Sequence, residues 1–295
     1  MPTEVKQTEA QRLAEVFQRI DSPSVLVVGD VCTDRWIALA NRRDNPESDA
    51  PCWQTAGEVA PTLGMAGNVA EHLTGLGANV RRLSPPMHVV KTRLVDADGR
   101  QVLRYDCDRT ATLSDALGTL RLAEMSVRRW GPETVALVDY GKGALPDGDD
   151  LRTLIAAARE RNIHVLVDPA RGADWQKYAG ATVIKPNVVE YRESYIALDP
   201  DPLLFITRGG FGADLVSHPL DTGQWFPATS RTSIDPCGAG DAVMAMLAYC
   251  LAGGVQIEDA CKLSMHAGGL AVERLGTKPF TRDELIADIL QGETQ

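Results

Sequence analysis

The chain has 295 residues, enough for one large domain, and its 44% hydrophobic and 24% charged residues are ordinary for a soluble globular protein. Its net charge of −10 argues against nucleic acid or an anionic membrane surface as a partner. Because there is no cationic-then-apolar leader and no apolar run of about 18 residues or more, we expect a cytoplasmic protein. The six cysteines lack metal-type spacing, and Cys250 and Cys261 are expected to be buried thiols.

The first part of the chain combines helical periodicity with β-like runs. Along the chain, the pattern predicts a helix over 1–20, a buried strand over 24–29, short β-like pieces over 35–60, a helix over 63–78 and a hairpin formed by 88–95 and 100–107. Since 35–60 does not fit a strand-plus-helix unit, we expect it to join the hairpin in a small antiparallel flap beside the main sheet.

The rest of the chain alternates strands with helices. The predicted strands are 134–140, 163–169, 181–187, 203–210 and 213–217, and the predicted helices are 114–129, 149–161, 240–252, 258–273 and 282–290. This alternation predicts an α/β fold with a doubly wound, mostly parallel sheet and helices on both faces. We expect a single domain over 1–295, with lid segments at about 35–60 and 88–107.

The most informative motif is Gly238-Ala239-Gly240-Asp241, which opens an apolar helix. Glycines allow close backbone approach to a ligand, and the first amides of a helix attract negative charge. If a sugar hydroxyl attacks a phosphate here, Asp241 takes the proton while the amides of Cys237–Gly240 hold phosphoryl oxygens. Alternatively, Asp241 is only a first-turn acid stabilised by the helix dipole. The motif alone leaves both interpretations open.

Other candidate residues follow predicted strands, where open α/β sheets bind their ligands. Asp30 and Asp34 follow the first strand and are candidate ligand contacts or turn aspartates. Lys142, held between two glycines, suits an anionic substrate group, or is a solvated loop lysine. Asn68, near a helix start, is either a donor to a ligand or a helix cap, and without other evidence we interpret it as a cap.

Two further stretches fit a nucleotide. Asn187 and Glu190 lie one helical turn apart, and one carboxylate is enough to help hold Mg²⁺ with phosphates. Taken alone, however, the pair is better explained as a helix cap and a first-turn acid. The turn Arg208-Gly209-Gly210-x-Gly212 is a weak sign of a nucleotide loop. Neither a Gly-x4-Gly-Lys-Ser/Thr loop nor a G-x-G-x-x-G after the first strand is present. These absences argue against P-loop enzymes and dinucleotide-dependent dehydrogenases, so the sum favours phosphoryl transfer.

Taken in order, these motifs resemble the ribokinase-like (PfkB) sugar kinases from about Val25 to Phe280. The matching stretches are GD-V-x-x-D, GxAGNVA, DYGKGAL, VDPARG, KPN-x-x-E, TRGG-x-G and D-x-CGAGD. Within the family the chain is most similar to the heptose kinases, which phosphorylate C1 of D-glycero-β-D-manno-heptose 7-phosphate. The resemblance implies ATP and Mg²⁺ as cofactors, a sugar phosphate as substrate, and a homodimer paired through the β lid.

Carried over by position, the resemblance also assigns roles to single residues. It implies Asp241 as catalytic base with the amides of Gly238, Ala239 and Gly240 as anion hole. It implies sugar-phosphate contacts for Asp30, Asp34, Asn68 and Lys142, nucleotide contacts for Asn187, Glu190, Arg208, Gly210, Gly212 and Gly238, and Mg²⁺ held by Glu190 and Asn187 through water.

The chain departs from the family pattern in three places. Leu63-Gly64 replaces a pair of glycines, the segment between Val80 and His88 lacks a strand-plus-helix unit, and a helix is nearly absent between Tyr195 and Leu203. No fused adenylyltransferase domain is expected, since the sequence ends at 295. The alternatives are a PfkB kinase for another sugar or a nucleoside, and a non-catalytic binding protein on a degenerate kinase fold.

Overall fold

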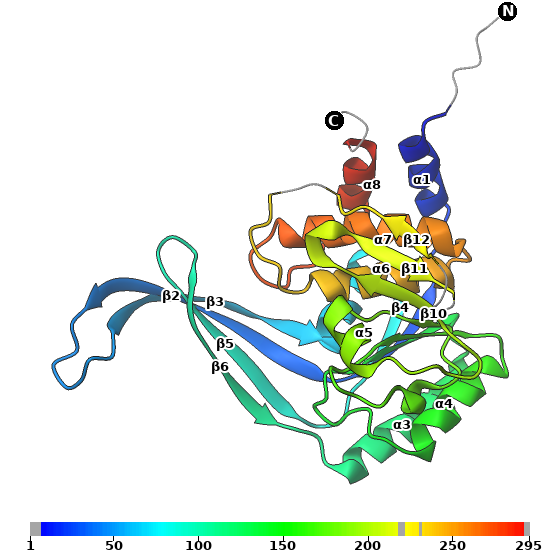
Figure 1. The fold of residues 1–295 in the computed structure, drawn as a ribbon, viewed down its shortest axis with the longest axis horizontal. Coiled ribbons are helices and arrows are strands. Elements are labelled where there is room, and N and C mark those ends of the chain that lie inside the picture. Colours follow the sequence, from blue (N-terminus) through cyan, green and yellow to red (C-terminus); the bar gives the residue numbers. More distant parts are fainter. Residues whose placement is uncertain (1–6, 218–221, 230–231, 292–295) are drawn as a thin grey trace, which may run out of the picture.

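The computed structural model describes residues 7–217, 222–229 and 232–291. Its first helix is α1 (Glu9–Gln18), so the predicted helix over 1–20 is shorter at both ends, and 1–6 lie outside the described residues. Thr8 caps α1 by accepting from the Gln11 amide, while the Gln11 side chain accepts from the Thr8 amide. The element labels are those of Figure 1.

Within the described residues, eight strands form the main sheet in the order β12-β11-β10-β9-β8-β7-β1-β4. Six neighbours, from β10 to β4, run parallel, while β11 and β12 extend one end of the sheet antiparallel. Their bounds are β1 Ser24–Gly29, β4 Asn79–Leu83, β7 Thr134–Val138, β8 His164–Asp168, β9 Val183–Ile184, β10 Leu203–Thr207, β11 Ala213–Val216 and β12 Gln224–Phe226. The predicted doubly wound, mostly parallel sheet is confirmed.

Helices cover both faces of this sheet (Figure 1). Along β1, Val25 and Val27 face the side covered by α1, α2, α6, α7 and α8, whereas Leu26 and Val28 face α3 and α4. Because both faces are covered, the strand is apolar from Val25 to Val28. The remaining helices are α2 Ala66–Gly75, α3 Leu113–Trp130, α4 Asp149–Arg159, α5 Val188–Ser194, α6 Ala239–Ala252, α7 Ile257–Val272 and α8 Arg282–Gln291, with short 3₁₀ turns η1 Trp175–Tyr178 and η2 Gly209–Phe211.

A four-stranded lid extends away from the body (Figure 1). Its strands, in the spatial order β3-β2-β5-β6, are β3 Cys52–Met65, β2 Val31–Arg43, β5 His88–Val95 and β6 Gln101–Arg109. The two outer pairs are antiparallel, as predicted, but the central pair β2–β5 is parallel, so the expectation of a wholly antiparallel lid is wrong in this pairing. The reason is topological: β2 and β5 continue from the neighbouring parallel strands β1 and β4 and leave the same edge of the sheet.

The predicted departures from the family pattern have clear positions in the fold. Between Val80 and His88 the chain completes β4 and passes to β5 without a helix. β4 is an edge strand that the sequence did not predict, because Asn79, Arg81 and Arg82 make most of it polar. Residues 196–202 join α5 to β10 without a helix, as expected. Among the described residues, no helix is both long and apolar enough to cross a bilayer.

Candidate active site

Asp241 lies in the first turn of α6, the central helix between the sheet and α7. The helix is buried on every side, which explains why its sequence is apolar all round. Gly238 precedes it with φ of +81°, and a Cβ at this position would lie 2.8 Å from Nδ2 of Asn68. A glycine is therefore required both for the left-handed turn and for the close approach of Asn68.

The carboxylate of Asp241 is 4% exposed and has two side-chain donors. Nδ2 of Asn68 donates to Oδ2 at 2.9 Å, and the hydroxyl of Tyr140 donates to Oδ1 at 2.8 Å. Burial raises the pKa of Asp241, while the hydrogen bonds from Asn68 and Tyr140 and the charges of Lys185 and Lys91 lower it. Asn68 is thus a partner of the predicted base. The interpretation of Asn68 as a helix cap is wrong, since Met65 is the N-cap of α2.

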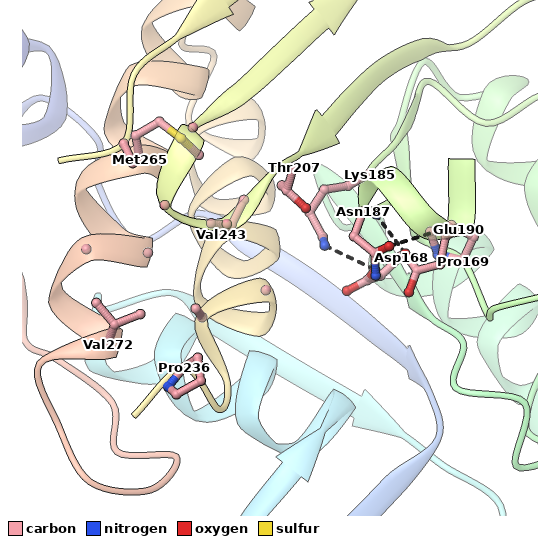
Figure 2. Close-up of a pocket in the computed structure, with 18 of the residues that line it drawn as sticks. Asp168, Pro169, Lys185, Asn187, Glu190, Thr207, Pro236, Val243, Met265 and Val272 are labelled. Atoms are coloured by element: carbon pink, nitrogen blue, oxygen red, sulfur yellow. Dashed lines mark hydrogen bonds and ion pairs between the residues drawn. The ribbon is translucent and has the colours of Figure 1, made fainter. Parts of the chain in front are cut away.

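A cavity of about 630 Å³ opens beside Tyr140 and Gly240 at the carboxyl edge of the sheet. Figure 2 shows its polar wall, which includes Lys185, Asn187 and Glu190, and its apolar wall of Val243, Met265 and Val272 from α6 and α7. Volumes of about 300–1,000 Å³ are usual for sites that bind small molecules. One polar and one apolar wall suit a ligand that combines phosphates with an aromatic base.

Asn187 and Glu190 both line the cavity. In the structure they form a capping box: Oδ1 of Asn187 accepts from the amides of Val189 and Glu190, and Oε2 of Glu190 accepts from the Asn187 amide. The interpretation of this pair as a helix cap and its interpretation as a nucleotide contact are therefore compatible, because the two residues that form the capping box also line the cavity.

Lys185 and Asp168 form a buried ion pair at the same wall, with Nζ 3.1 Å from Oδ1 (Figure 2). Burial is the largest cause of the rise in the pKa of Asp168 to about 7, and Lys185 opposes it. A Cβ at Gly240 would lie 3.7 Å from Nζ of Lys185, so this ammonium is close to the start of α6. Neither residue was given a role from the sequence, although each lies near the end of a predicted strand.

The residues predicted to contact the sugar phosphate are engaged within the protein. Oδ2 of Asp30 accepts the amides of Tyr140 and Lys142, at 2.7 and 3.0 Å, and its Oδ1 accepts the amide of Ala144 at 2.9 Å. Lys142 pairs through Nζ with the carboxylate of Asp108 on β6. Asp30 therefore fixes the loop after β7, and Lys142 links that loop to the lid.

Asp34, on β2 of the lid, forms a buried ion pair with Arg93 of β5. A Cβ at Gly64 would lie 2.3 Å from Oδ2 of Asp34 and 2.5 Å from Sγ of Cys32. The Leu63-Gly64 departure thus keeps the glycine that the Asp34 side chain requires.

The glycine turn after β10 contributes Gly209, Gly210 and Gly212 to the cavity wall. Arg208, predicted to contact the nucleotide, instead pairs with Asp214, and its side chain does not line the cavity within the described residues. Gly212 has φ of +90°, and a Cβ there would lie 2.0 Å from the carbonyl oxygen of Phe226. The turn is therefore packed closely against β12.

The amides ahead of α6 only partly match the predicted anion hole. The Cys237 amide donates to Oδ1 of Asp235 at 3.0 Å, so it is already used and does not belong to the set. Ala239 and Gly240 line the cavity, at a helix terminus whose first amides lack intrahelical acceptors. The Ala239 amide is also used within the protein, since it donates to the carbonyl oxygen of Pro236 at 3.4 Å. The amides of Gly238 and Gly240 therefore remain the candidates for the anion hole.

Oxygen donors of the kind that Mg²⁺ prefers lie along the polar wall, on Asp168, Asn187 and Glu190. Among the described residues, no group of three or more His, Cys, Asp or Glu side chains is arranged to hold a metal ion directly. The donors present fit a hydrated cation that is bound together with phosphates.

The doubly wound sheet, its β lid and the glycine-led helix at the cavity define a carbohydrate kinase of the ribokinase-like class, a phosphotransferase. The chain belongs to the PfkB carbohydrate kinase family: the profile of the pfkB family carbohydrate kinases matches residues 140–283. The resemblance seen in the sequence is confirmed.

Similar proteins support the same family. The "Bifunctional protein HldE" of Paramagnetospirillum magneticum is 32% identical, in an alignment that covers 98% of this chain and 68% of that protein. The proteins of the same name from Acidiphilium cryptum and Nitrosococcus oceani are 35% and 32% identical over 89% and 90% of this chain. The chain spans only 62% and 63% of the length of these two relatives.

Solved structures show the same fold at lower sequence identity. Phosphofructokinase-2 from Escherichia coli, in complex with potassium, has a TM-score of 0.68 at 17% identity, covering 92% of this chain and 99% of that one. Ribokinase from Thermotoga maritima has a TM-score of 0.66 at 16% identity, covering 91% and 99%.

Proposed function

We propose that the chain is an ATP- and Mg²⁺-dependent sugar kinase that phosphorylates the C1 hydroxyl of D-glycero-β-D-manno-heptose 7-phosphate. The observation that carries the proposal is the position of Asp241, a buried carboxylate in the first turn of α6 that follows Gly240 and is hydrogen-bonded to Tyr140, both of which line the cavity. A base there can accept the proton of a hydroxyl that attacks a phosphoryl group held by the first amides of the helix.

The cavity supports ATP as phosphate donor. The apolar wall suits the adenine ring, and the polar wall, with Lys185 and the nearby Gly240 amide at the start of α6, suits the phosphates. Asn187, Glu190 and Asp168 would hold Mg²⁺, with Asn187 and Glu190 acting through water. When bound, Mg²⁺ neutralises charge on the phosphate oxygens. Phosphoryl transfer depends chiefly on positioning and electrostatics, which these groups supply.

The heptose phosphate is supported by the DYGKGAL and DP…YAGAT…PN stretches and by NPESDAP in the lid, which resemble the heptose kinases. In this proposal Asp30, Asp34 and Lys142 lie on the sugar-phosphate side, where the lid meets the loop after β7. Because Asp30 and Asp34 already have partners within the protein, they would hold the loop after β7 and the lid in place on that side of the site. Lys142 would exchange its contact with Asp108 for the phosphate of the substrate.

The lid supports the proposal of a homodimer. Strand β6 is exposed along its whole length and carries three large exposed apolar side chains, Val102, Leu103 and Tyr105. An exposed edge strand is a template for pairing with another strand. Pairing of two lids would cover this edge, and measurement of the molar mass in solution tests it.

The test of the function is ADP release with ATP–Mg²⁺ and a panel containing the heptose 7-phosphate, fructose phosphates, ribose and adenosine. We expect turnover on the heptose phosphate, reduced about 10²–10⁴-fold in Asp241→Asn because general-base assistance is typically worth that much. The exposed Asp98→Asn is the matched control and should retain full activity.

The other outcomes separate the alternatives. Turnover on another member of the panel would assign the chain to a kinase for that sugar or nucleoside. Unchanged turnover in Asp241→Asn would remove this residue from the mechanism. Thermal stabilisation by ATP–Mg²⁺ without turnover on any sugar would indicate a binding protein on a kinase fold.

A further inference from the structure

The hydroxyl of Tyr140 and the side-chain amide of Asn68 donate hydrogen bonds to the two different oxygens of the Asp241 carboxylate. Tyr140 follows β7 and donates to Oδ1 of Asp241, while Asn68, in α2, donates to Oδ2. Three elements that lie far apart in the sequence therefore meet at one side chain. Neither donor is needed to satisfy a helix end, since Met65 is the N-cap of α2 and Tyr140 lies in a loop.

We propose that Tyr140, together with Asn68, is a positioning residue that fixes the carboxylate of Asp241 in the orientation and ionised form required of a base. This inference rests on the proposed function and extends it to two residues that do not themselves take the proton. Each carboxylate oxygen accepts more than one hydrogen bond, so one donor on each leaves room for the hydroxyl of a substrate.

Tyr140 is itself held from two directions. Its amide donates to Oδ2 of Asp30, which fixes the backbone of the loop, and Nζ of Lys91 lies 5.1 Å from the centroid of its ring. Lys91 belongs to β5 of the lid, so the lid contacts the base through Tyr140. Although Tyr140 as a whole is 38% exposed, desolvation of its hydroxyl and the negative charge of Asp241 raise its pKa well above the usual value, so the hydroxyl keeps the proton that it donates.

The carboxylate of Asp241 needs these hydrogen bonds to stay ionised because it is buried, and burial disfavours the charged form. The charged and titratable groups around it come from four other elements: Lys91 on β5, Lys185 after β9, Asp168 on β8 and the Cys32 thiol on β2. The two lysines favour the carboxylate, whereas the negative charge of Asp168 opposes it. Burial raises the pKa of Cys32 to about 12, so this thiol stays neutral. Tyr140 and Asn68 are the direct donors that offset burial.

The test is a pH titration of the Asp241 carboxyl by carbon-13 NMR, in protein labelled at the aspartate carboxyl and assigned with Asp241→Asn. In Tyr140→Phe we expect the midpoint to rise by about one pH unit, because a hydrogen bond to a charged group is worth roughly that much. Asn68→Leu, of similar size, should shift it in the same direction. Tyr195→Phe is the control, since the structure shows no hydrogen bond from that hydroxyl within the described residues.

Kinetics provide the second measurement. In Tyr140→Phe the acid limb of kcat/KM should move to higher pH by the same amount, with activity recovering as the pH rises. A general loss of structure would lower activity at every pH instead. An unchanged midpoint in both Tyr140→Phe and Asn68→Leu overturns the proposal. If the wild-type chain turns over no sugar on the panel, the proposed function fails, but the titration still decides whether the two donors control Asp241.

Discussion

Nζ of Lys185 lies 3.1 Å from Oδ1 of Asp168, and both side chains are buried where the cavity wall meets the start of α6. A buried ion pair tolerates the loss of both partners better than the loss of one, because a single survivor is left as an uncompensated charge. In this protein the pair also lies beside the candidate anion hole. Stability and catalysis can therefore be separated by comparing single and double variants.

Lys185→Met should lower kcat by about 10²–10³-fold, as expected for the loss of one preorganised charge beside the transferring phosphoryl group. It should also lower the free energy of unfolding by about 3–5 kcal/mol, because Asp168 remains buried without its partner. Urea unfolding and ADP release measure the two effects. In Lys185→Met/Asp168→Asn, stability should return while turnover should not. Recovery of turnover in the double variant would contradict a role for Lys185 beyond its ion pair, and the exposed Lys278→Met is the control.

His72 should make the protein sensitive to mild acid. It is buried in α2 against Phe280, with ring centroids 4.8 Å apart, and within the described residues its Nδ1 has no hydrogen-bond partner. Burial lowers its pKa from 6.5 to about 4. The unfolded chain therefore binds a proton below about pH 6.5 that the folded chain does not bind until about pH 4, so stability falls as the pH falls through this window. The free energy of unfolding lost through His72 across this pH range is about 3 kcal/mol.

The His72→Gln variant tests this contribution. Its free energy of unfolding should fall less steeply than that of the wild type between pH 6.5 and pH 4, whatever its stability at neutral pH. His88→Gln, at an exposed position at the start of β5, should keep the wild-type slope. Equal slopes in all three proteins would show that His72 does not contribute.

Asp30→Asn should destabilise the fold by at least about 2 kcal/mol. The carboxylate accepts three amides from the loop 140–144, hydrogen bonds to a charged group are worth about 1.5–3 kcal/mol each, and an asparagine would turn an NH₂ group toward some of these donors. Urea unfolding measures the cost, with the exposed Asp21→Asn as control. Wild-type stability with weaker binding of the sugar phosphate would instead make Asp30 purely a substrate contact.

Gly212→Ala and Gly210→Ala form a matched pair in one turn. A Cβ at Gly212 would lie 2.0 Å from the carbonyl oxygen of Phe226, at a φ of +90°, whereas a Cβ at Gly210 would have nothing within 4 Å. We expect Gly212→Ala to cost at least about 2 kcal/mol of unfolding free energy and Gly210→Ala to stay within about 0.5 kcal/mol of the wild type. Thermal unfolding at equal concentration compares them. Similar melting temperatures would show that the turn rearranges at little cost.

The sequence predicted most of the main sheet because the strands that are covered on both faces have runs of apolar residues. The predictions failed where this reason does not hold. Strand β4 is a polar edge strand, β12 is three residues long, and the parallel pairing of β2 with β5 depends on which strands precede them in the sheet. Periodicity within a segment contains no information about such pairings.

In the candidate site, too, the sequence predicted what depends on neighbouring residues and missed what depends on contacts between distant segments. Asp241 was predicted from a local motif, since a glycine turn, a helix start and a carboxylate are adjacent in the chain. The partners of Asp241 were not, because Tyr140 and Asn68 reach it across 101 and 173 residues of sequence. Asp34 and Lys142 were expected to be available to a ligand, but Arg93 and Asp108, which no local pattern connects to them, are their partners in the fold.

The lid is joined to the site at its base and is free at its tips. Strand β2 begins one residue after Asp30, β3 ends at the N-cap of α2, and the Ala111 amide, just beyond β6, donates to the carbonyl of Lys142. The connections at 44–51 and 96–100 lie at the opposite ends of these strands. Insertions in these two loops would leave unchanged the end of the lid that adjoins the site. The loops can therefore vary in length, in evolution or by engineering, without moving a residue of the site.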